Sequence, residues 1–353
     1  MSTYKEETKL MHQQKVEQLL DDELPSFCKL YYDARFIRLA SKTQLDYASK
    51  MKIFLEFLHD NNSYFGKRPI KEYTIDDLAL LTVRDFEEFS RWILKQKKHK
   101  NSKKHKDTNQ KGTVENYMAC LSSYFSFFVK EELLPKNPIL AIERVKKQKR
   151  PIIYLQADDR GDFMNVVTTG IGLTKKQKAA WDKTKLRETC MMQLLMDTGI
   201  RISELVGLDI SDVDLKHCML SIERKGDKPD HAYFSDSTAD LLTEYIEYRK
   251  TMYVQNKEED ALFLVSQGKY RGTRLSVRSV QVIVKKFAQS AHVTDAKKIT
   301  PHKLRSTYAM SMLETTQNPA IVQQQLGHEN ISTTVLYASG TEDDKKKNRN
   351  NIF

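Results

Sequence analysis

Residues 186–205 have the sequence LRETCMMQLLMDTGIRISEL, and the architecture of the chain can be worked out from this stretch in both directions. Its apolar residues predict a helix over 186–197. Gly199 should end that helix, because glycine readily takes the left-handed conformation that closes helices. Arg201 and Glu204 would then lie just beyond the helix end. An arginine after a glycine turn is usually a surface or capping residue, so this stretch alone does not name a function.

The pattern on either side of this stretch predicts a mainly α-helical protein with a small sheet. In the N-terminal part, residues 41–60, 74–94 and 113–134 carry apolar side chains at helical spacing, and each predicts one helix. Residues 219–234 alternate around the turn Lys225-Gly226-Asp227, which predicts two paired strands. Further helices are expected at 236–253, 276–291, 300–316, 318–326 and 332–339.

The run ERVKKQKRP, residues 143–151, is the best candidate for a domain boundary. It has five basic residues followed by a proline, and no apolar periodicity. We therefore expect an all-helical domain over 1–142, a basic linker over 143–151, and a second domain with a C-terminal tail over 152–353.

The charge balance favours a polyanionic partner. The chain has 58 Lys and Arg residues against 47 Asp and Glu residues, a formal charge of +11. Lysines that neutralise phosphates release counterions, which drives binding to nucleic acid. A well-solvated, lysine-rich protein is the alternative. The candidate DNA-binding residues lie in the loop expected over 95–111 and in the linker: Lys97, Lys98, Lys100, Lys103, Lys104, Lys106, Lys146, Lys147, Lys149 and Arg150.

Several classes of protein are disfavoured. The apolar stretches are too short to span a bilayer and the N-terminus lacks a secretory signal, so no membrane partner is expected. The four cysteines have no paired spacing, which argues against a disulfide scaffold and fits the cytoplasm. The candidate segments described below contain no HExxH, no paired aspartates and no CxxC, and the chain has no GxxxxGK[ST] loop. We therefore expect no metal and no other cofactor.

Five short segments stand out: TGIRISEL (198–205), RKGDK (224–228), HKLR (302–305), LGH (326–328) and Tyr337. Each is a weak signal alone, because short motifs often match by chance. In their order and spacing they resemble the active site of the tyrosine recombinase (phage integrase) family. The matching residues are Arg201, Lys225, His302, Arg305, His328 and Tyr337, with Glu204 at a position that is usually acidic in the family.

The resemblance covers most of the chain. It implies a helical core-binding (SAM-like) domain, followed by an α+β catalytic domain with a small antiparallel sheet. Residues 41–142 resemble the core-binding domain and residues 152–339 the catalytic domain. Within the family, the RKGxK hairpin, the TPHKLR segment and the polar LTKKQ stretch resemble the XerS-type recombinases.

The chemistry of the family explains the residue types. Guanidiniums at Arg201 and Arg305 can bind phosphate oxygens bidentately and remain charged at any relevant pH. The resemblance implies that Tyr337 is the nucleophile and forms a 3′-phosphotyrosyl intermediate. It further assigns His302 as base or proton relay, Lys225 as proton donor to the leaving 5′-oxygen, and His328 as hydrogen-bond donor to the phosphate. Glu204 would orient Arg201 or His302, or would be a plain helix-surface carboxylate.

The sequence therefore predicts a site-specific recombinase. The resemblance implies that it acts on double-stranded DNA with a near-palindromic site, as a homotetramer on synapsed DNA, and through a Holliday junction. Chromosome dimer resolution is the favoured task, and integration or excision of a phage or conjugative element is the alternative. The sequence identifies no accessory or divisome partner. Two rival functions are a catalytically silent DNA-binding protein of the same fold and a type IB topoisomerase.

Overall fold

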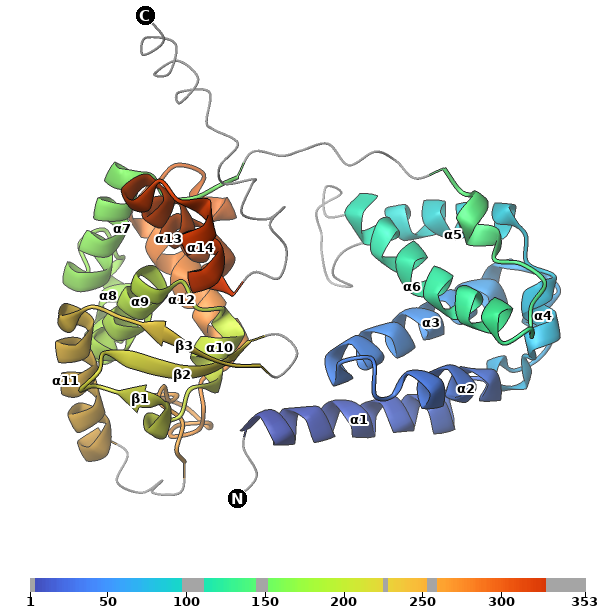
Figure 1. Ribbon diagram of the computed structural model, residues 1–353, viewed down its shortest axis with the longest axis horizontal. Coiled ribbons are helices and arrows are strands. Elements are labelled where there is room, and N and C mark those ends of the chain that lie inside the picture. The colour runs from blue at the N-terminus through green and yellow to red at the C-terminus, as the bar shows by residue number, and fades with distance from the viewer. Residues whose placement is uncertain (1–3, 97–110, 144–151, 225–227, 253–258, 328–353) are drawn as a thin grey trace, which may run out of the picture. The chain divides into compact units, whose positions relative to one another are not determined.

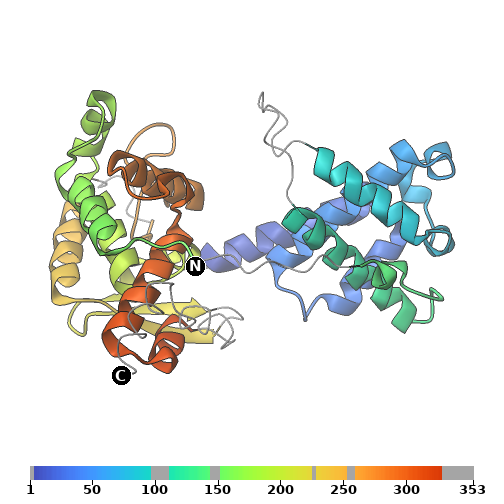
Figure 2. The same cartoon turned by 90° about the horizontal axis from the view of Figure 1, so that it is seen from above.

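A computed structural model describes residues 4–96, 111–143, 152–224, 228–252 and 259–327. The chain divides into two compact units, Met1–Gln148 and Lys149–Phe353 (Figures 1 and 2). Both units are mainly helical, and the second also contains a small antiparallel sheet, as the sequence predicted. None of the described helices is long and apolar enough to cross a membrane.

The described part of the first unit is entirely helical. Its core is aromatic: the ring of Phe54 stacks on that of Phe86 at 5.2 Å, and Phe125 meets Phe86 edge-on at 5.3 Å. All three rings are buried. Its helices are α1 (Tyr4–Asp22), α2 (Ser26–Arg35), α3 (Ser41–Asn61), α4 (Ile75–Ala79), α5 (Val83–Lys95) and α6 (Lys111–Lys130), with 3-10 turns at Phe65–Lys67, Ile70–Glu72 and Pro138–Ala141.

The prediction of one helix over 74–94 was wrong, because this stretch contains two helix starts. Thr74 caps α4, and Thr82 caps α5 in the same way. The carboxylate of Asp85 accepts hydrogen bonds from the backbone N–H of Thr82 at 2.9 Å and from its hydroxyl at 2.8 Å. Such a capping box satisfies orphan donors at a helix start, so the chain breaks and begins a new helix at this threonine.

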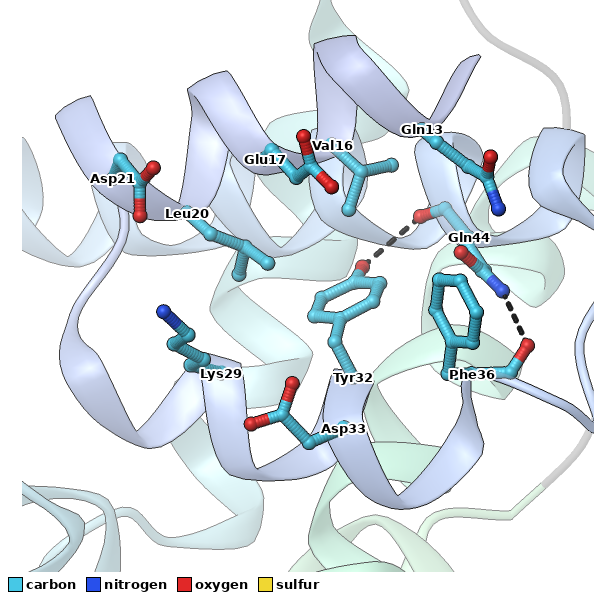
Figure 3. Close-up of a pocket in the computed structure, with 10 residues that line it drawn as sticks. All are labelled: Gln13, Val16, Glu17, Leu20, Asp21, Lys29, Tyr32, Asp33, Phe36 and Gln44. Carbon is cyan, nitrogen blue, oxygen red and sulfur yellow. Dashed lines mark hydrogen bonds between the residues drawn. The ribbon is translucent and has the colours of Figure 1, made fainter. Parts of the chain in front are cut away.

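A pocket of about 300 Å³ lies between α1, α2 and α3 (Figure 3). Gln44 closes one end of it, where its amide donates to the carbonyls of Phe36 at 2.9 Å and Leu39 at 2.8 Å. The hydroxyl of Tyr32 donates to the carbonyl of Gln44 at 3.0 Å. These bonds connect the α2–α3 turn to the start of α3, which gives Gln44 and Tyr32 a structural role.

The second unit surrounds one central helix, α9 (Lys185–Thr198), which packs against α7, α11 and α13. Most of its side chains are buried, including Cys190, Met191 and Leu194. The other helices of the unit are α7 (Ala157–Thr169), α8 (Lys175–Asp182), α10 (Ile202–Gly207), α11 (Asp236–Met252), α12 (Val277–Ser290), α13 (Pro301–Thr316) and α14 (Pro319–Leu326), with 3-10 turns at Ile210–Asp212 and Ala296–Lys298.

The sheet has three antiparallel strands in the order β1–β2–β3, one more than predicted. They are β1 (Val213–Asp214), β2 (Met219–Arg224) and β3 (Lys228–Tyr233). The β2–β3 register pairs Met219 with Tyr233 and Arg224 with Lys228. Figure 1 shows α10 beside the end of β2 at which the hairpin turns, and these two elements are in contact. The hairpin thereby meets the segment that follows α9.

Candidate active site

The site begins at the turn that ends α9. Gly199 has a φ of +60°, and its N–H donates to the carbonyl of Leu195. A Cβ at this position would lie 2.3 Å from the ring of Tyr308. Glycine is therefore required here by its conformation and by the space available. The turn places Arg201 at the start of α10, as the residue that precedes its first helical position.

Glu204 holds Arg201 through two bonds. The carboxylate accepts from the backbone N–H of Arg201 at 2.6 Å and from its guanidinium Nη1 at 2.7 Å. The Glu204 side chain is only 5% exposed, whereas that of Arg201 is 33% exposed. Glu204 is thus buried rather than on the helix surface, and it orients an arginine that is open to solvent.

Arg305 connects two of the motifs through backbone carbonyls. It lies on the buried face of α13, and its Nη1 donates to the carbonyl of Gly199 at 2.5 Å. Its Nη2 donates to the carbonyl of Leu326, at the end of α14, also at 2.5 Å. The last carbonyls of a helix lack partners within the helix and carry partial negative charge, so a cation there is favourable. Arg305 therefore lies at the same turn as Arg201.

His302 precedes Arg305 by one helical turn on α13, and its side chain is partly covered but accessible to solvent. Partial burial lowers the pKa of His302 below its ordinary value of 6.5, and the charges of Lys303, Arg305 and Arg201 lower it further. The shift favours the neutral form of the imidazole, which can accept a proton. His302 lies in the first turn of α13, and the charges of both arginines act on it.

Arg224, the last residue of β2, was missed by the sequence analysis. Its guanidinium donates to Asp230 at 2.8 Å, to the carbonyl of Gln325 at 2.8 Å and to Glu204 at 3.3 Å. Burial alone would raise the pKa of Asp230, but hydrogen bonds from Arg224 and from the backbone of His231 lower it overall. The one available signal was the alternation in β2, which puts Arg224 on the same inward side as Leu220 and Ile222.

Tyr308 lies near these arginines but is poorly suited to be a nucleophile. Burial raises its pKa to about 12, and the nearby charge of Asp197 adds to the shift, although Arg224 and Arg305 oppose it. Such a phenol holds its proton more tightly than free tyrosine does. Its ring instead fills the space beside Gly199.

The structure brings together Arg201, Glu204, His302 and Arg305 from the predicted set. Lys225, His328 and Tyr337 lie outside the described residues, as do all of the basic residues predicted in the loop and linker. Across the described ranges, no group of three His, Cys, Asp or Glu residues is placed to hold a metal ion.

Comparison with known proteins identifies the family. Residues 171–343 match the phage integrase family. The chain is 27% identical to tyrosine recombinase XerS of Streptococcus uberis over 344 residues, which covers 92% of this chain and 94% of that protein. It is 28% identical to XerS of Streptococcus equi subsp. zooepidemicus over 343 residues, with coverage of 92% and 94%.

Two solved structures share the fold. The integrase of the transposon Tn1549, in complex with circular intermediate DNA, matches with a TM-score of 0.62, 20% identity, and coverage of 92% of this chain and 99% of that one. The XerH site-specific recombinase bound to its difH substrate matches with a TM-score of 0.60, 18% identity, and coverage of 96% and 88%.

Residues 171–343 carry the match to the phage integrase family, and the similarity to tyrosine recombinases extends over nearly the whole chain, which is a site-specific DNA recombinase by class. Its likeness to XerS extends over nearly the whole length of both proteins, as the RKGxK, TPHKLR and LTKKQ segments had predicted.

Proposed function

We propose that this recombinase cuts and rejoins double-stranded DNA through a covalent 3′-phosphotyrosyl intermediate. The observation that carries the proposal is the convergence of Arg201 and Arg305 at the Gly199 turn, with the Glu204 carboxylate holding one of them and His302 coupled to both. Preorganised positive charge of this kind stabilises the negative charge that develops on a phosphate during attack.

The reaction proceeds by two transesterifications. The phenolic oxygen of Tyr337 attacks the scissile phosphorus, a new P–O bond forms to tyrosine, and the bond to the 5′-oxygen breaks. The phenol proton passes to His302, and Lys225 supplies a proton to the leaving 5′-oxygen. His328 donates a hydrogen bond to a non-bridging oxygen. A 5′-hydroxyl of the partner strand then attacks the phosphotyrosine, which restores the phosphodiester without ATP.

The substrate is a near-palindromic duplex to which subunits bind in pairs. Residues 1–142 form the core-binding domain, 143–151 the basic linker, and 152–353 the catalytic domain with its tail. The basic residues predicted in the loop and the linker contact phosphates, which gives affinity without sequence specificity. Two occupied sites synapse as a homotetramer, and strands exchange in pairs through a Holliday junction.

Chromosome dimer resolution is the biological task that we favour, because the similarity to proteins named XerS extends over 92% of the chain. The solved integrase of Tn1549 resembles the chain in fold alone, at 20% identity, and therefore does not favour mobile-element integration. A cytoplasmic location is in keeping with the four cysteines, all of which are free thiols.

A plasmid assay tests the function. We expect purified protein to delete or invert the segment between two target sites on a supercoiled plasmid, in buffer that contains EDTA and no ATP. The control plasmid carries no target site and should remain supercoiled. Relaxation of site-free plasmid at a similar rate would instead support the type IB topoisomerase, and binding without any product would support the silent DNA-binding protein.

The pH dependence of cleavage tests the role of His302. Because the folded protein lowers the pKa of His302, the neutral, proton-accepting form persists below pH 6.5. The second-order rate of cleavage, which reports groups of the free enzyme, should rise with pH to a midpoint below 6.5 and then level off. His302→Gln should abolish that midpoint and slow cleavage. An unchanged midpoint in His302→Gln would assign the titration to another group.

A further inference from the structure

Arg224 is buried, with only 8% of its surface exposed, yet it makes side-chain bonds to three different segments. Its Nε donates to Asp230 on the neighbouring strand β3. Its Nη1 donates to Glu204 on α10, and its Nη2 donates to the carbonyl of Gln325 in α14. Each guanidinium nitrogen therefore contacts a different element of the unit. A planar, rigid fork is suited to fixing three partners at once.

The contact with α14 is close enough to require a glycine. Gly327 has a φ of +58°, and a Cβ there would lie 2.9 Å from Nε of Arg224 and 3.1 Å from its Cδ. The glycine of the LGH motif thus gives room for this arginine. Two consecutive carbonyls at the end of α14 accept from two different arginines, that of Gln325 from Arg224 and that of Leu326 from Arg305.

Glu204 is the common partner of the network. Its Oε2 accepts both from Arg224 and from the backbone N–H of Arg201, while its Oε1 accepts from the Arg201 guanidinium. Without Arg224, the buried carboxylate would have Arg201 as its only cationic partner among these bonds. Its full charge would then act on Arg201, which would be held more tightly and would be less available to an anion.

We propose that Arg224 is a positioning residue that fixes the β2–β3 hairpin and α14 relative to Glu204, and through Glu204 sets the availability of Arg201. In the chain, Arg224 directly precedes Lys225 and Gly327 directly precedes His328, so the same arginine holds the segments that lead into both residues. This inference rests on the proposed function, because its consequence is measured as strand cleavage.

The test compares Arg224→Gln with Arg249→Gln. Arg249 is equally buried, at 7% exposure, and donates to the carbonyls of Ala261 and Glu259, outside the site. Both variants lose a buried cation, so both should unfold at lower temperature. Well below either transition, Arg224→Gln should cleave a nicked target site at least about tenfold more slowly while binding it within about twofold. Arg249→Gln should cleave like the wild type.

A double-mutant cycle and hydrogen exchange complete the test. If Arg224 acts through Glu204, the effect of Arg224→Gln on cleavage should be clearly smaller in a Glu204→Gln background, because the two changes act on one network. Arg224→Lys should restore part of the rate. Amide exchange in peptides that cover residues 319–327 should be faster in Arg224→Gln and unchanged in Arg249→Gln.

The outcomes separate this inference from the proposed function. Failure of the wild type to cleave would overturn the proposed function, and the exchange result would then decide the inference alone. Unchanged exchange at residues 319–327 would overturn the inference even with an active wild type. Cleavage that falls equally in both variants, or effects that simply add in the cycle, would also overturn it.

Discussion

Tyr337→Phe should form no covalent adduct with a nicked target site, whereas the wild type should accumulate one. A nick close to the cleavage position lets the short 5′-hydroxyl fragment diffuse away after attack, so the phosphotyrosine cannot be resealed. Phenylalanine keeps the ring but lacks the oxygen that attacks phosphorus, so the loss should be complete rather than partial. The measurement is a denaturing gel on which the adduct migrates as protein linked to labelled DNA.

Tyr308→Phe is the matched control. Tyr308 lies near Arg224 and Arg305, but its pKa is raised to about 12, and its ring rather than its hydroxyl fills the space beside Gly199. This variant should therefore form adduct at close to the wild-type rate. Adduct formation by Tyr337→Phe at the wild-type level would refute the assignment of the nucleophile and, with it, the mechanism.

Arg201→Ala and Arg305→Ala should each reduce cleavage by at least about a hundredfold while changing site binding by only a few-fold. Removal of one preorganised donor from a site of developing negative charge costs on the order of a hundred- to a thousandfold in rate. Under the proposed function, binding depends instead on many phosphate contacts spread over both domains, so the loss of one arginine should affect it little. The two quantities are measured by adduct formation and by gel shift on the same duplex.

The two variants differ in their expected effect on stability. The Arg201 side chain is 33% exposed, so its removal leaves the fold largely intact. Arg305 is buried and donates to the carbonyls of Gly199 and Leu326, so Arg305→Ala should also lower the unfolding temperature. Arg249→Ala, which removes another buried arginine that is bound to two carbonyls, controls for that loss. Equal loss of binding and cleavage in Arg201→Ala would contradict a catalytic role.

Local sequence patterns predicted the elements that carry the site. The helix expected over 186–197 is α9, and it ends at the glycine that had been expected to end it. The alternating segment 219–234 contains the β2–β3 hairpin. These predictions succeeded because helix periodicity, strand alternation and the left-handed glycine cap depend on residues close together in the chain.

The errors have physical causes of two kinds. The first kind is a local signal that was not used. Thr82 and Asp85 form a capping box within an otherwise periodic stretch, and this box divides 74–94 into α4 and α5. The network of Arg224 was beyond any local pattern, because its partners Glu204 and Gln325 lie 20 and 101 positions away. Only the fold brings them together.

The assignment of the catalytic residues combines the sequence motifs with the structure. The Gly199 turn brings Arg201 and Arg305 to one place. The order and spacing of these residues along the chain suggest this proximity only through the resemblance to the family. The roles of Lys225, His328 and Tyr337 follow from their motifs and remain predictions. These roles are therefore tested by experiments that identify the reacting atoms directly.

Mass spectrometry of the trapped adduct tests the central claim most directly. Adduct formed on a nicked site is digested with protease and nuclease, and the nucleotide-bearing peptide is sequenced. The mechanism predicts a single modified residue, Tyr337, joined through its phenolic oxygen to a 3′-phosphate. A nucleotide on Tyr308 or on another residue, or a linkage to the 5′ end of the DNA, would contradict it.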